Sequence, residues 1–153
     1  RSHPGTPFLH KYYFTRGRGH FMPANHTVPG ELPDQKYPLL LMTGRIYHHY
    51  HTGTMTRKSE RLTRECDRAV LQINPADAKA KSLRQGETVR LASRRGEITL
   101  AASITDQVEP GMVYTTFHFH EAPINLLTND AFDTGSHCPE YKICAVRIEK
   151  MNS

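Results

Sequence analysis

The sequence predicts a mainly β fold, a closed or nearly closed barrel with one or two short helices. Short apolar or alternating runs recur from Tyr37 to the C-terminus, and tight turns rich in glycine or proline separate them. Clear helix signals occur in a single segment, which begins at Asn74. Several short strands joined by turns, with little helix between them, are typical of a sheet that closes on itself.

The totals fit a single domain with an N-terminal arm. The chain has 153 residues, enough to bury a real core. Twenty Lys and Arg against fifteen Asp and Glu give a net charge of +5, which suits an acidic or phosphorylated partner as well as simple solubility. No apolar run approaches the roughly 20 residues of a membrane span, so we expect no membrane insertion. The first ten residues lack the layout of a secretory signal, and we expect a cytoplasmic protein, with a periplasmic parent left open.

The cysteines exclude one class of cofactor. The three cysteines, Cys66, Cys138 and Cys144, form no CxxC pair, which rules out a cysteine-bound zinc or iron–sulfur site of familiar spacing. A disulfide between Cys138 and Cys144 is an alternative, but we favour free thiols.

Residues 1–36 are predicted to be an extended arm that leads into the barrel, residues 37–150. Prolines and glycines recur throughout this segment and leave no window for a long helix. Short strands are expected at residues 12–15 and 20–22, around the turn Arg16-Gly17-Arg18-Gly19. The segment VPGELPD, residues 28–34, is expected to lie along the surface as a linker.

The segment YPLLLMTGRIYHHYHTGTMT, residues 37–56, is the most informative part of the barrel. Leu39–Met42 form an apolar run short enough for a strand buried on both faces. The run ends at Thr43-Gly44-Arg45 and leads into a loop of histidine, threonine and glycine, with no acidic residue before Glu60. Glycine allows a close backbone approach to a ligand, and arginine can clamp a phosphate. This composition indicates a polyanionic, nucleotide-like ligand.

The remaining elements follow in order. Residues 57–68 are charged and predict an irregular loop or a short helix, and residues 69–73 predict a strand. Asn74 as N-cap, Pro75 at the first position and Asp77 in the first turn mark a helix that continues to about Leu83, with Gly86 helping to end it. Further strands are expected at residues 89–93, 98–104, 112–119 and 143–148. The first two of these flank an exposed hairpin turn at residues 94–97, and residues 125–129 are expected to form one helical turn.

Five segments in a fixed order carry a family resemblance. They are YPLLLMTGRIYHHYHTGTMTR, INPADAKAKSL, LRQGETVRLASRRGEI, VEPGMVYTTFHFHEAPINLLTNDAFD and PEYKICAVRIE. Together they resemble the C-terminal molybdopterin-dinucleotide-binding domain of molybdenum or tungsten oxidoreductases. The formate dehydrogenase alpha subunits look most similar, with the periplasmic nitrate reductases nearby. The resemblance covers residues 37–149, and GTPFLH and GRGHFMP look like the lead-in from the preceding domain.

The resemblance implies a six-stranded double-psi β-barrel that closes over a bis-molybdopterin guanine dinucleotide between domains of a large subunit. The complete subunit would hold the molybdenum or tungsten. The implied partners are the remaining domains of the same catalytic subunit and iron–sulfur electron-transfer subunits. The implied parent activity is the two-electron oxidation of formate to CO2.

The resemblance also implies the site residues. The cofactor-binding positions are Arg45, Tyr47, His49, His51, Thr52, Gly53, His118, Asn125, Tyr141 and Lys142. Their imidazole, guanidinium, ammonium and amide groups suit the acceptors of pterins and phosphates. In the family, a metal-bound Cys or selenocysteine with a neighbouring His and a distant Arg lie in another domain. No counterpart occurs here, so we expect neither catalytic residues nor metal ligands in this chain.

Two other classes compete with this reading. His49/His51 and His118/His120 are H-x-H pairs, and with Glu121 they allow a cupin-like histidine–carboxylate metal site. However, Glu121 directly follows His120, so on a strand it would point to the opposite face. Arginines and tyrosines interleave in a way that allows a basic nucleic-acid-binding barrel. Acidic residues break up that charge and no RNA-binding signature motif occurs, so we expect no nucleic-acid partner.

Overall fold

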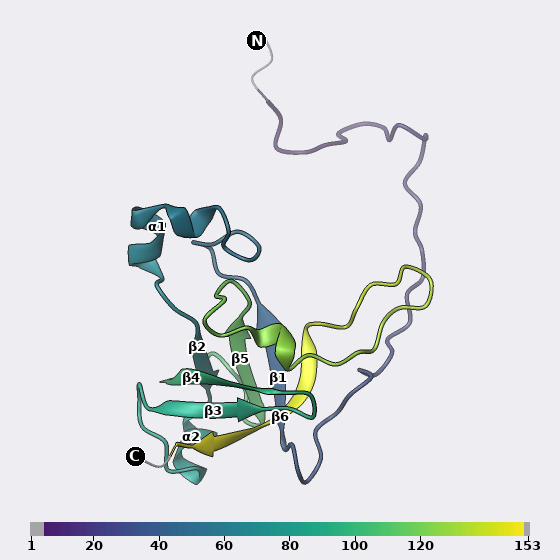
Figure 1. Cartoon of the computed structure of the whole chain (residues 1–153). Coiled ribbons are helices and arrows are strands. Elements are labelled where there is room, and N and C mark those ends of the chain that lie inside the picture. Colours follow the sequence, from purple (N-terminus) through teal and green to yellow (C-terminus); the bar gives the residue numbers. More distant parts are fainter. Residues whose placement is uncertain (1–4, 152–153) are drawn as a thin grey trace.

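Six strands form a closed barrel in the computed structural model, which describes residues 5–151 (Figure 1). Around the barrel the strands follow the order β1-β5-β2-β4-β3-β6. Their bounds are β1 (Leu39–Gly44), β2 (Val70–Ile73), β3 (Thr88–Ala92), β4 (Glu97–Ile104), β5 (Met112–Thr116) and β6 (Ile143–Lys150). The predicted mainly β fold class is confirmed.

The strand pairing is mixed. β1 pairs with β5 and β2 pairs with β4 in parallel, whereas β1–β6, β2–β5, β3–β4 and β3–β6 are antiparallel. Parallel neighbours cannot be joined by a hairpin, so long connections must cross the barrel ends. This arrangement agrees with the double-psi barrel that the resemblance implies.

The helical segments are short and lie in the connections. They are η1 (Thr56–Lys58), α1 (Glu60–Glu65), α2 (Pro75–Ala80) and η2 (Ile124–Leu126). No helix within residues 5–151 is long and apolar enough to cross a bilayer.

The start of α2 follows the prediction, but its end does not. The Asn74 side chain accepts a hydrogen bond from the backbone N–H of Ala76, and Pro75 opens the helix. The helix was expected to reach about Leu83, yet it ends at Ala80 because Ser82 turns the backbone to φ +52°. That turn brings Leu83 into the core, where its side chain is buried.

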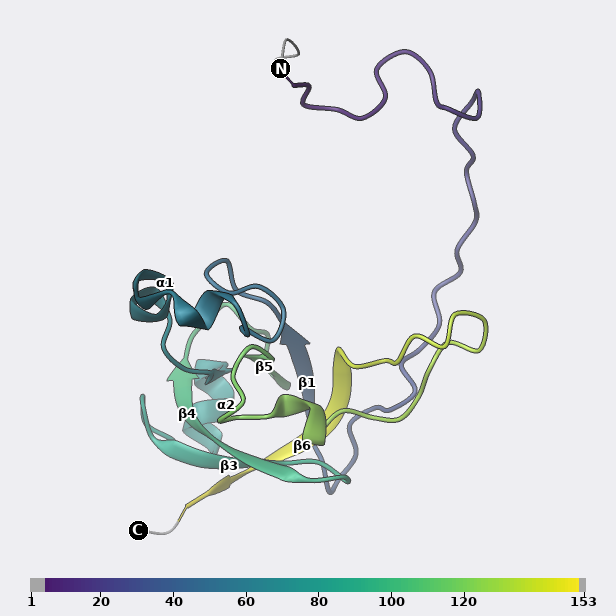
Figure 2. The same ribbon diagram turned by 45° about the horizontal axis from the view of Figure 1, so that its top comes forward.

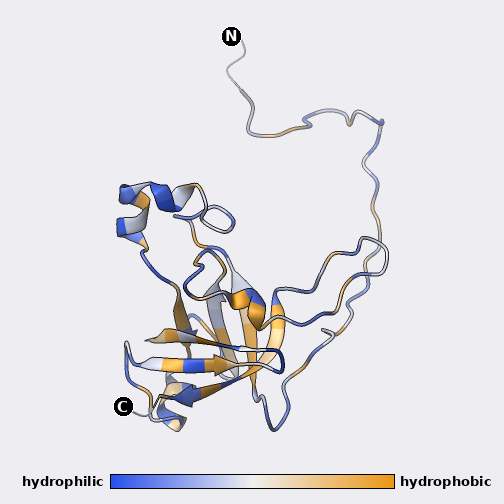
Figure 3. Ribbon diagram, viewed as in Figure 1, coloured by the Kyte–Doolittle hydropathy of each residue, from blue (hydrophilic) through white to orange (hydrophobic). Residues whose placement is uncertain are grey.

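The core lies inside the barrel, and apolar residues concentrate on the strands (Figure 3). β1 was expected to be buried on both faces, but its burial alternates. Leu39, Leu41 and Thr43 point inward, whereas Met42 is 38% exposed. β5 ends at Thr116, three residues earlier than predicted. The prediction of free thiols holds for all three cysteines, and burial raises the pKa of the Cys144 thiol to about 11.

The arm runs away from the barrel as an extended segment (Figures 1 and 2). The strands expected at residues 12–15 and 20–22 are wrong, since a lone bridge between Phe14 and Gly17 is the sole β pairing in the described part of the arm. The segment has no second strand with which to build a ladder, and its aromatic side chains, such as Tyr12 and Phe21, are exposed. Residues 1–4 of the predicted arm lie outside the described residues.

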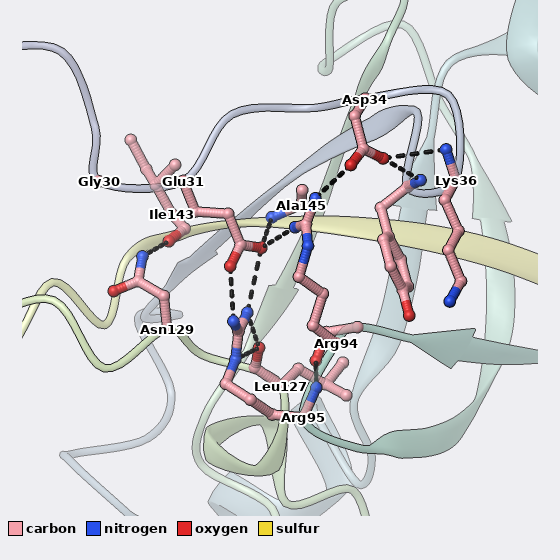
Figure 4. A network of polar contacts seen from close by, with 12 residues as sticks. Gly30, Glu31, Asp34, Lys36, Arg94, Arg95, Leu127, Asn129, Ile143 and Ala145 are labelled. Carbon is pink, nitrogen blue, oxygen red and sulfur yellow. Dashed lines mark hydrogen bonds and ion pairs between the residues drawn. The ribbon is translucent and has the colours of Figure 1, made fainter.

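The arm reaches the barrel at a cluster we call the anchor, which consists of Glu31 and Asp34 with Arg94 and Arg95 (Figure 4). Glu31 lies 2.5 Å from Arg95 Nη1 and 3.0 Å from Arg94 Nη1, and it accepts a 2.7 Å hydrogen bond from the Ala145 N–H. The Glu31 side chain is only 12% exposed. Burial raises its pKa, but the contacts with Arg95 and Ala145 outweigh burial, and the pKa is lowered.

The anchor adds long-range ion pairs to the hairpin turn that was expected at residues 94–97. Residues 93–96 form the turn between β3 and β4, and Arg94 and Arg95 are exposed as predicted. Arg94 pairs with Asp34 as well as Glu31, and Arg95 donates two hydrogen bonds to the Leu127 carbonyl. The linker is therefore fixed to the barrel by ion pairs that centre on the largely covered Glu31 carboxylate.

Candidate functional site

Two loops meet at one end of the barrel and form what we call the rim, residues 44–58 and 117–122. The first loop follows β1 and the second follows β5. β1 and β5 are parallel neighbours, with Gly44 opposite Thr116. Because parallel strands end at the same edge of a sheet, both loops begin side by side.

His118 is fully buried and fastens the two rim loops together. Its Nε2 accepts a 3.0 Å hydrogen bond from the Ile46 N–H, and its Nδ1 contacts the His51 carbonyl. Acceptance at Nε2 requires a neutral ring, with the proton on Nδ1 donated to His51. Burial lowers the pKa of His118, which agrees with this neutral form. His118 thus holds both ends of the segment from Ile46 to His51.

His49 makes a second internal connection. Its Nε2 lies 2.8 Å from the Cys66 carbonyl and donates to it, and its Nδ1 lies 3.1 Å from Thr56 Oγ1. The same Thr56 hydroxyl accepts the Tyr50 N–H at 3.1 Å. Since both ring nitrogens of His49 and of His118 are engaged within the chain, these two histidines shape the rim through its backbone.

Gly53 lets the first loop lie directly against the second. Its φ is +74°, and a Cβ there would stand 2.8 Å from the His118 carbonyl oxygen and 2.8 Å from Arg57 Cδ. His51, two residues earlier, also has a positive φ of 48°. A side chain at position 53 would therefore push the loops apart.

Other predicted residues present their donors outward. Arg45 lies 3.4 Å from the His51 ring and stacks over Phe117 at 5.6 Å. Tyr47 is fully exposed. The Thr52 hydroxyl lies 3.0 Å from that of Thr54.

Tyr141 and Lys142 join the same end of the barrel. Thr43, at the end of β1, donates to the Tyr141 carbonyl through its hydroxyl and to the Lys142 carbonyl through its N–H, at 2.9 and 3.0 Å. The Tyr141 ring packs edge-on against Phe117. Asn125 lies apart on η2 with an exposed side chain, and its backbone carbonyl accepts a 3.1 Å hydrogen bond from the Thr128 hydroxyl.

The structure adds rim residues that sequence reasoning missed. Arg57 and Glu121 form an ion pair between the loops, and Thr56 supports His49. From the sequence, Glu121 is a candidate only as a metal ligand, and Arg57 is only the first residue of the charged segment 57–68. Their pairing spans 64 positions, and no local pattern signals it.

The cupin-like metal site gains no support. Within residues 5–151 no group of three or more His, Cys, Asp or Glu side chains is placed to hold a metal ion. His49 and His118 have no free ring nitrogen, and Glu121 is bound to Arg57.

A sequence model of the Molydopterin dinucleotide binding domain matches residues 39–145. The chain belongs to this family. The match covers all of β1 to β5 and the first part of β6.

Relatives of this molybdopterin dinucleotide-binding domain are parts of larger proteins. The chain is 47% identical over 152 residues to the F420-dependent formate dehydrogenase subunit alpha of Methanocaldococcus jannaschii. It is 49% identical over 150 residues to the F420-dependent formate dehydrogenase 2 subunit alpha of Methanococcus maripaludis. These alignments cover 98% and 97% of this chain but only 23% and 22% of the relatives. Acetylene hydratase from Pelobacter acetylenicus has the same fold over 76% of this chain and 19% of its own, with a TM-score of 0.63 at 16% identity.

The donors of this molybdopterin dinucleotide-binding domain fit its cofactor class. Within residues 5–151 neither Arg45 nor Lys142 has a carboxylate partner, and no acidic residue occurs between Gly44 and Ser59. Guanidinium, ammonium and hydroxyl groups without counter-charges suit phosphates and pterin oxygens. Gly53 has no side chain, so the backbone of the first rim loop can pack closely against the second rim loop at this position.

Proposed function

We propose that this chain closes over a bis-molybdopterin guanine dinucleotide in the catalytic subunit of a molybdenum or tungsten oxidoreductase of the formate dehydrogenase type. The observation that carries the proposal is the first rim loop, in which Arg45 and the Thr52 hydroxyl have no acidic partner within residues 5–151. The identity of 41–49% to formate dehydrogenase alpha subunits, over nearly the whole chain, supports the choice of parent.

The predicted cofactor-binding residues with outward-facing donors each have a proposed role. Arg45 and Lys142 neutralise phosphate charge, and Tyr47, His51 and Thr52 donate to phosphate or pterin oxygens. The Asn125 amide, a donor and an acceptor, pairs with the edge of a pterin or guanine ring.

The remaining predicted residues set the geometry of the site. His49, His118 and Gly53 fix the conformation of the first rim loop, and the Tyr141 ring packs edge-on against Phe117 at the same end of the barrel. When bound, the cofactor supplies the two-electron chemistry that converts formate to CO2. This chain orients it and keeps water from its buried side.

The proposal extends to partners. We place the remaining domains of the catalytic subunit upstream of the arm, residues 1–36, with the barrel of residues 37–150 covering them. Iron–sulfur subunits would carry the electrons onward, and the names of the relatives favour F420 as the acceptor. The cytoplasm is the proposed compartment.

Removing Arg45 tests the site. In the complete subunit, Arg45→Ala should weaken cofactor retention about tenfold or more, because a charge-assisted hydrogen bond contributes about 1.5–3 kcal/mol. Pterin and metal content per subunit measure the loss. Arg61→Ala, on the exposed surface of α1, is the matched control. Circular dichroism should not change in either variant. Wild-type cofactor content and turnover in Arg45→Ala would show that Arg45 does not clamp the cofactor.

A further inference from the structure

An ion pair joins the two rim loops, and neither partner belongs to the predicted cofactor-binding set. Arg57 lies in η1 at the end of the first loop, and Glu121 lies in the second. Arg57 Nη1 lies 2.9 Å from Glu121 Oε2, and Nη2 lies 2.5 Å from Oε1. Two parallel bonds of this kind fix direction as well as distance.

The Arg57 side chain is held on several sides. Its guanidinium lies 5.0 Å from the centre of the Phe119 ring, and Nη1 also contacts His120 Nδ1 at 2.9 Å. The side chain is 21% exposed, while that of Glu121 is 56% exposed. The Arg57 side chain is thus largely covered, and the Glu121 side chain lies between it and the solvent.

Arg57 also packs against Gly53. A Cβ at Gly53 would meet Arg57 Cδ and Cγ at 2.8 and 2.9 Å, and the Arg57 N–H donates to the Gly53 carbonyl at 2.9 Å. The same Cβ would also lie 2.8 Å from the His118 carbonyl oxygen, so Gly53 has no room for a side chain between the two groups. Arg57 therefore supports Gly53 and, next to it, Thr52 and Thr54, whose side chains are exposed.

We propose that Arg57 and Glu121 are positioning residues that set the spacing of the two rim loops, and through Gly53 the placement of the donors that hold the phosphorylated pterin. This inference rests on the proposed function. Neither residue needs to touch the cofactor, because the pair acts through the backbone of residues 52–54.

The pair is a weak candidate for a purely structural role. Exposed ion pairs contribute about 0–1 kcal/mol to folding, and Glu121 is more than half exposed. The barrel core lies inside the strands and does not include either side chain. Loss of the pair should loosen the rim and leave the barrel folded.

The chain supplies a matched control pair. Arg68 binds Asp67 through two bonds of 2.9 and 2.6 Å, a geometry similar to that of Arg57 and Glu121. Asp67 and Arg68 are neighbours in sequence and connect no loops. Breaking this pair removes a bidentate contact without changing the spacing of the rim.

The test uses the complete subunit with Glu121→Gln, Arg57→Glu, the reversed pair Arg57→Glu/Glu121→Arg, and Arg68→Gln. The measurements are pterin and metal content and the rate of pterin release, with circular dichroism as the check on folding. We expect Glu121→Gln and Arg57→Glu to speed release about tenfold, the range found when residues supporting a ligand shell are lost. The reversed pair should recover most of the loss, and Arg68→Gln should behave like wild type.

Other outcomes separate the two proposals. Wild-type release in both single variants, or a reversed pair no better than Arg57→Glu alone, overturns the positioning role while the proposed function stands. A wild-type subunit that carries no pterin overturns the proposed function, and this inference with it.

Discussion

The anchor and the rim both hold charged side chains against the barrel, but they satisfy those charges in different ways. At the anchor, Glu31 and Asp34 meet Arg94 and Arg95, so each charge has a partner from this chain. At the rim, Arg45 has an imidazole and an aromatic ring as neighbours and no carboxylate among the described residues. The charged side chains of the anchor therefore stabilise the fold, whereas Arg45 at the rim is available to bind a ligand.

The anchor and the rim have one structural feature in common. Each contains a covered titratable group that accepts a backbone N–H, from Ala145 to Glu31 at the anchor and from Ile46 to His118 at the rim. Glu31 acts as an anion and its pKa is lowered by its partners. His118 acts as a neutral ring whose pKa is lowered by burial. Variants can therefore test each region separately.

The largest effect is expected at the anchor. Glu31→Ala removes the carboxylate that Arg94, Arg95 and the Ala145 N–H share, leaving Arg94 with Asp34 and Arg95 with the Leu127 carbonyl. It should lower the free energy of unfolding by about 3 kcal/mol. Chemical denaturation of the 153-residue chain, followed by circular dichroism, measures it. Glu65→Ala, exposed at the end of α1, should change stability by less than about 0.5 kcal/mol. Equal small effects in both variants would show that the anchor is merely a surface contact.

A smaller effect is expected within the rim at Gly53. Gly53→Ala adds a methyl group against the His118 carbonyl at a positive φ, and should cost about 2 kcal/mol. Gly86→Ala is the control, because Gly86 has a similar φ of +77° but open space around its Cβ position. It should cost about 1 kcal/mol from backbone strain alone. The denaturation midpoints of the two variants give the difference, and if they coincide, close packing at Gly53 contributes nothing.

Lowering the pH should disturb the two regions in sequence. His118 has a lowered pKa, so the unfolded or open state binds its proton first, and stability is lost as pH falls below the ordinary histidine value of 6.5. Glu31 also has a lowered pKa, and its contribution is kept until pH falls below the ordinary value of 4.5.

The two accepted amides report this sequence directly. In ¹H–¹⁵N NMR spectra the Ile46 signal should move at a higher pH than the Ala145 signal. Movement of both signals together would contradict the separate roles of His118 and Glu31.

The smallest effect on folding is expected at Tyr47, whose side chain is fully exposed. Tyr47→Ala should change the free energy of unfolding by less than about 0.5 kcal/mol, while pterin retention in the complete subunit should fall. Unchanged retention would remove Tyr47 from the site. A large loss of stability would place it with the anchor residues rather than with the outward donors.

The barrel could be predicted because its signals are local. Alternation, turn residues and the Asn74–Pro75 helix start each lie within a few positions, and the strands formed where these signals occur. The order of five family-like segments gave the double-psi topology, which local patterns cannot give.

What sequence reasoning missed depends on contacts across long separations. Glu31 meets Arg95 over 64 positions and Ala145 over 114, so residues 94–97 looked like an ordinary exposed turn. The burial of His49 and His118 follows from packing against Phe119, which a histidine-rich loop does not reveal. The positive φ at Ser82 ends the helix before Leu83, and the Leu83 side chain is buried in the core.

Closure of the barrel restricts how another protein can attach. Each of β1 to β6 is flanked on both sides by a hydrogen-bonded strand, so the sheet offers no edge on which a foreign strand could be added. A partner therefore cannot bind by adding a strand to this sheet. Amyloid-like stacking, which needs an exposed strand edge, is excluded for the same reason. Assembly must instead use side chains of loops or the extended N-terminal segment, where sequence can vary without disturbing the hydrogen-bonded ladder.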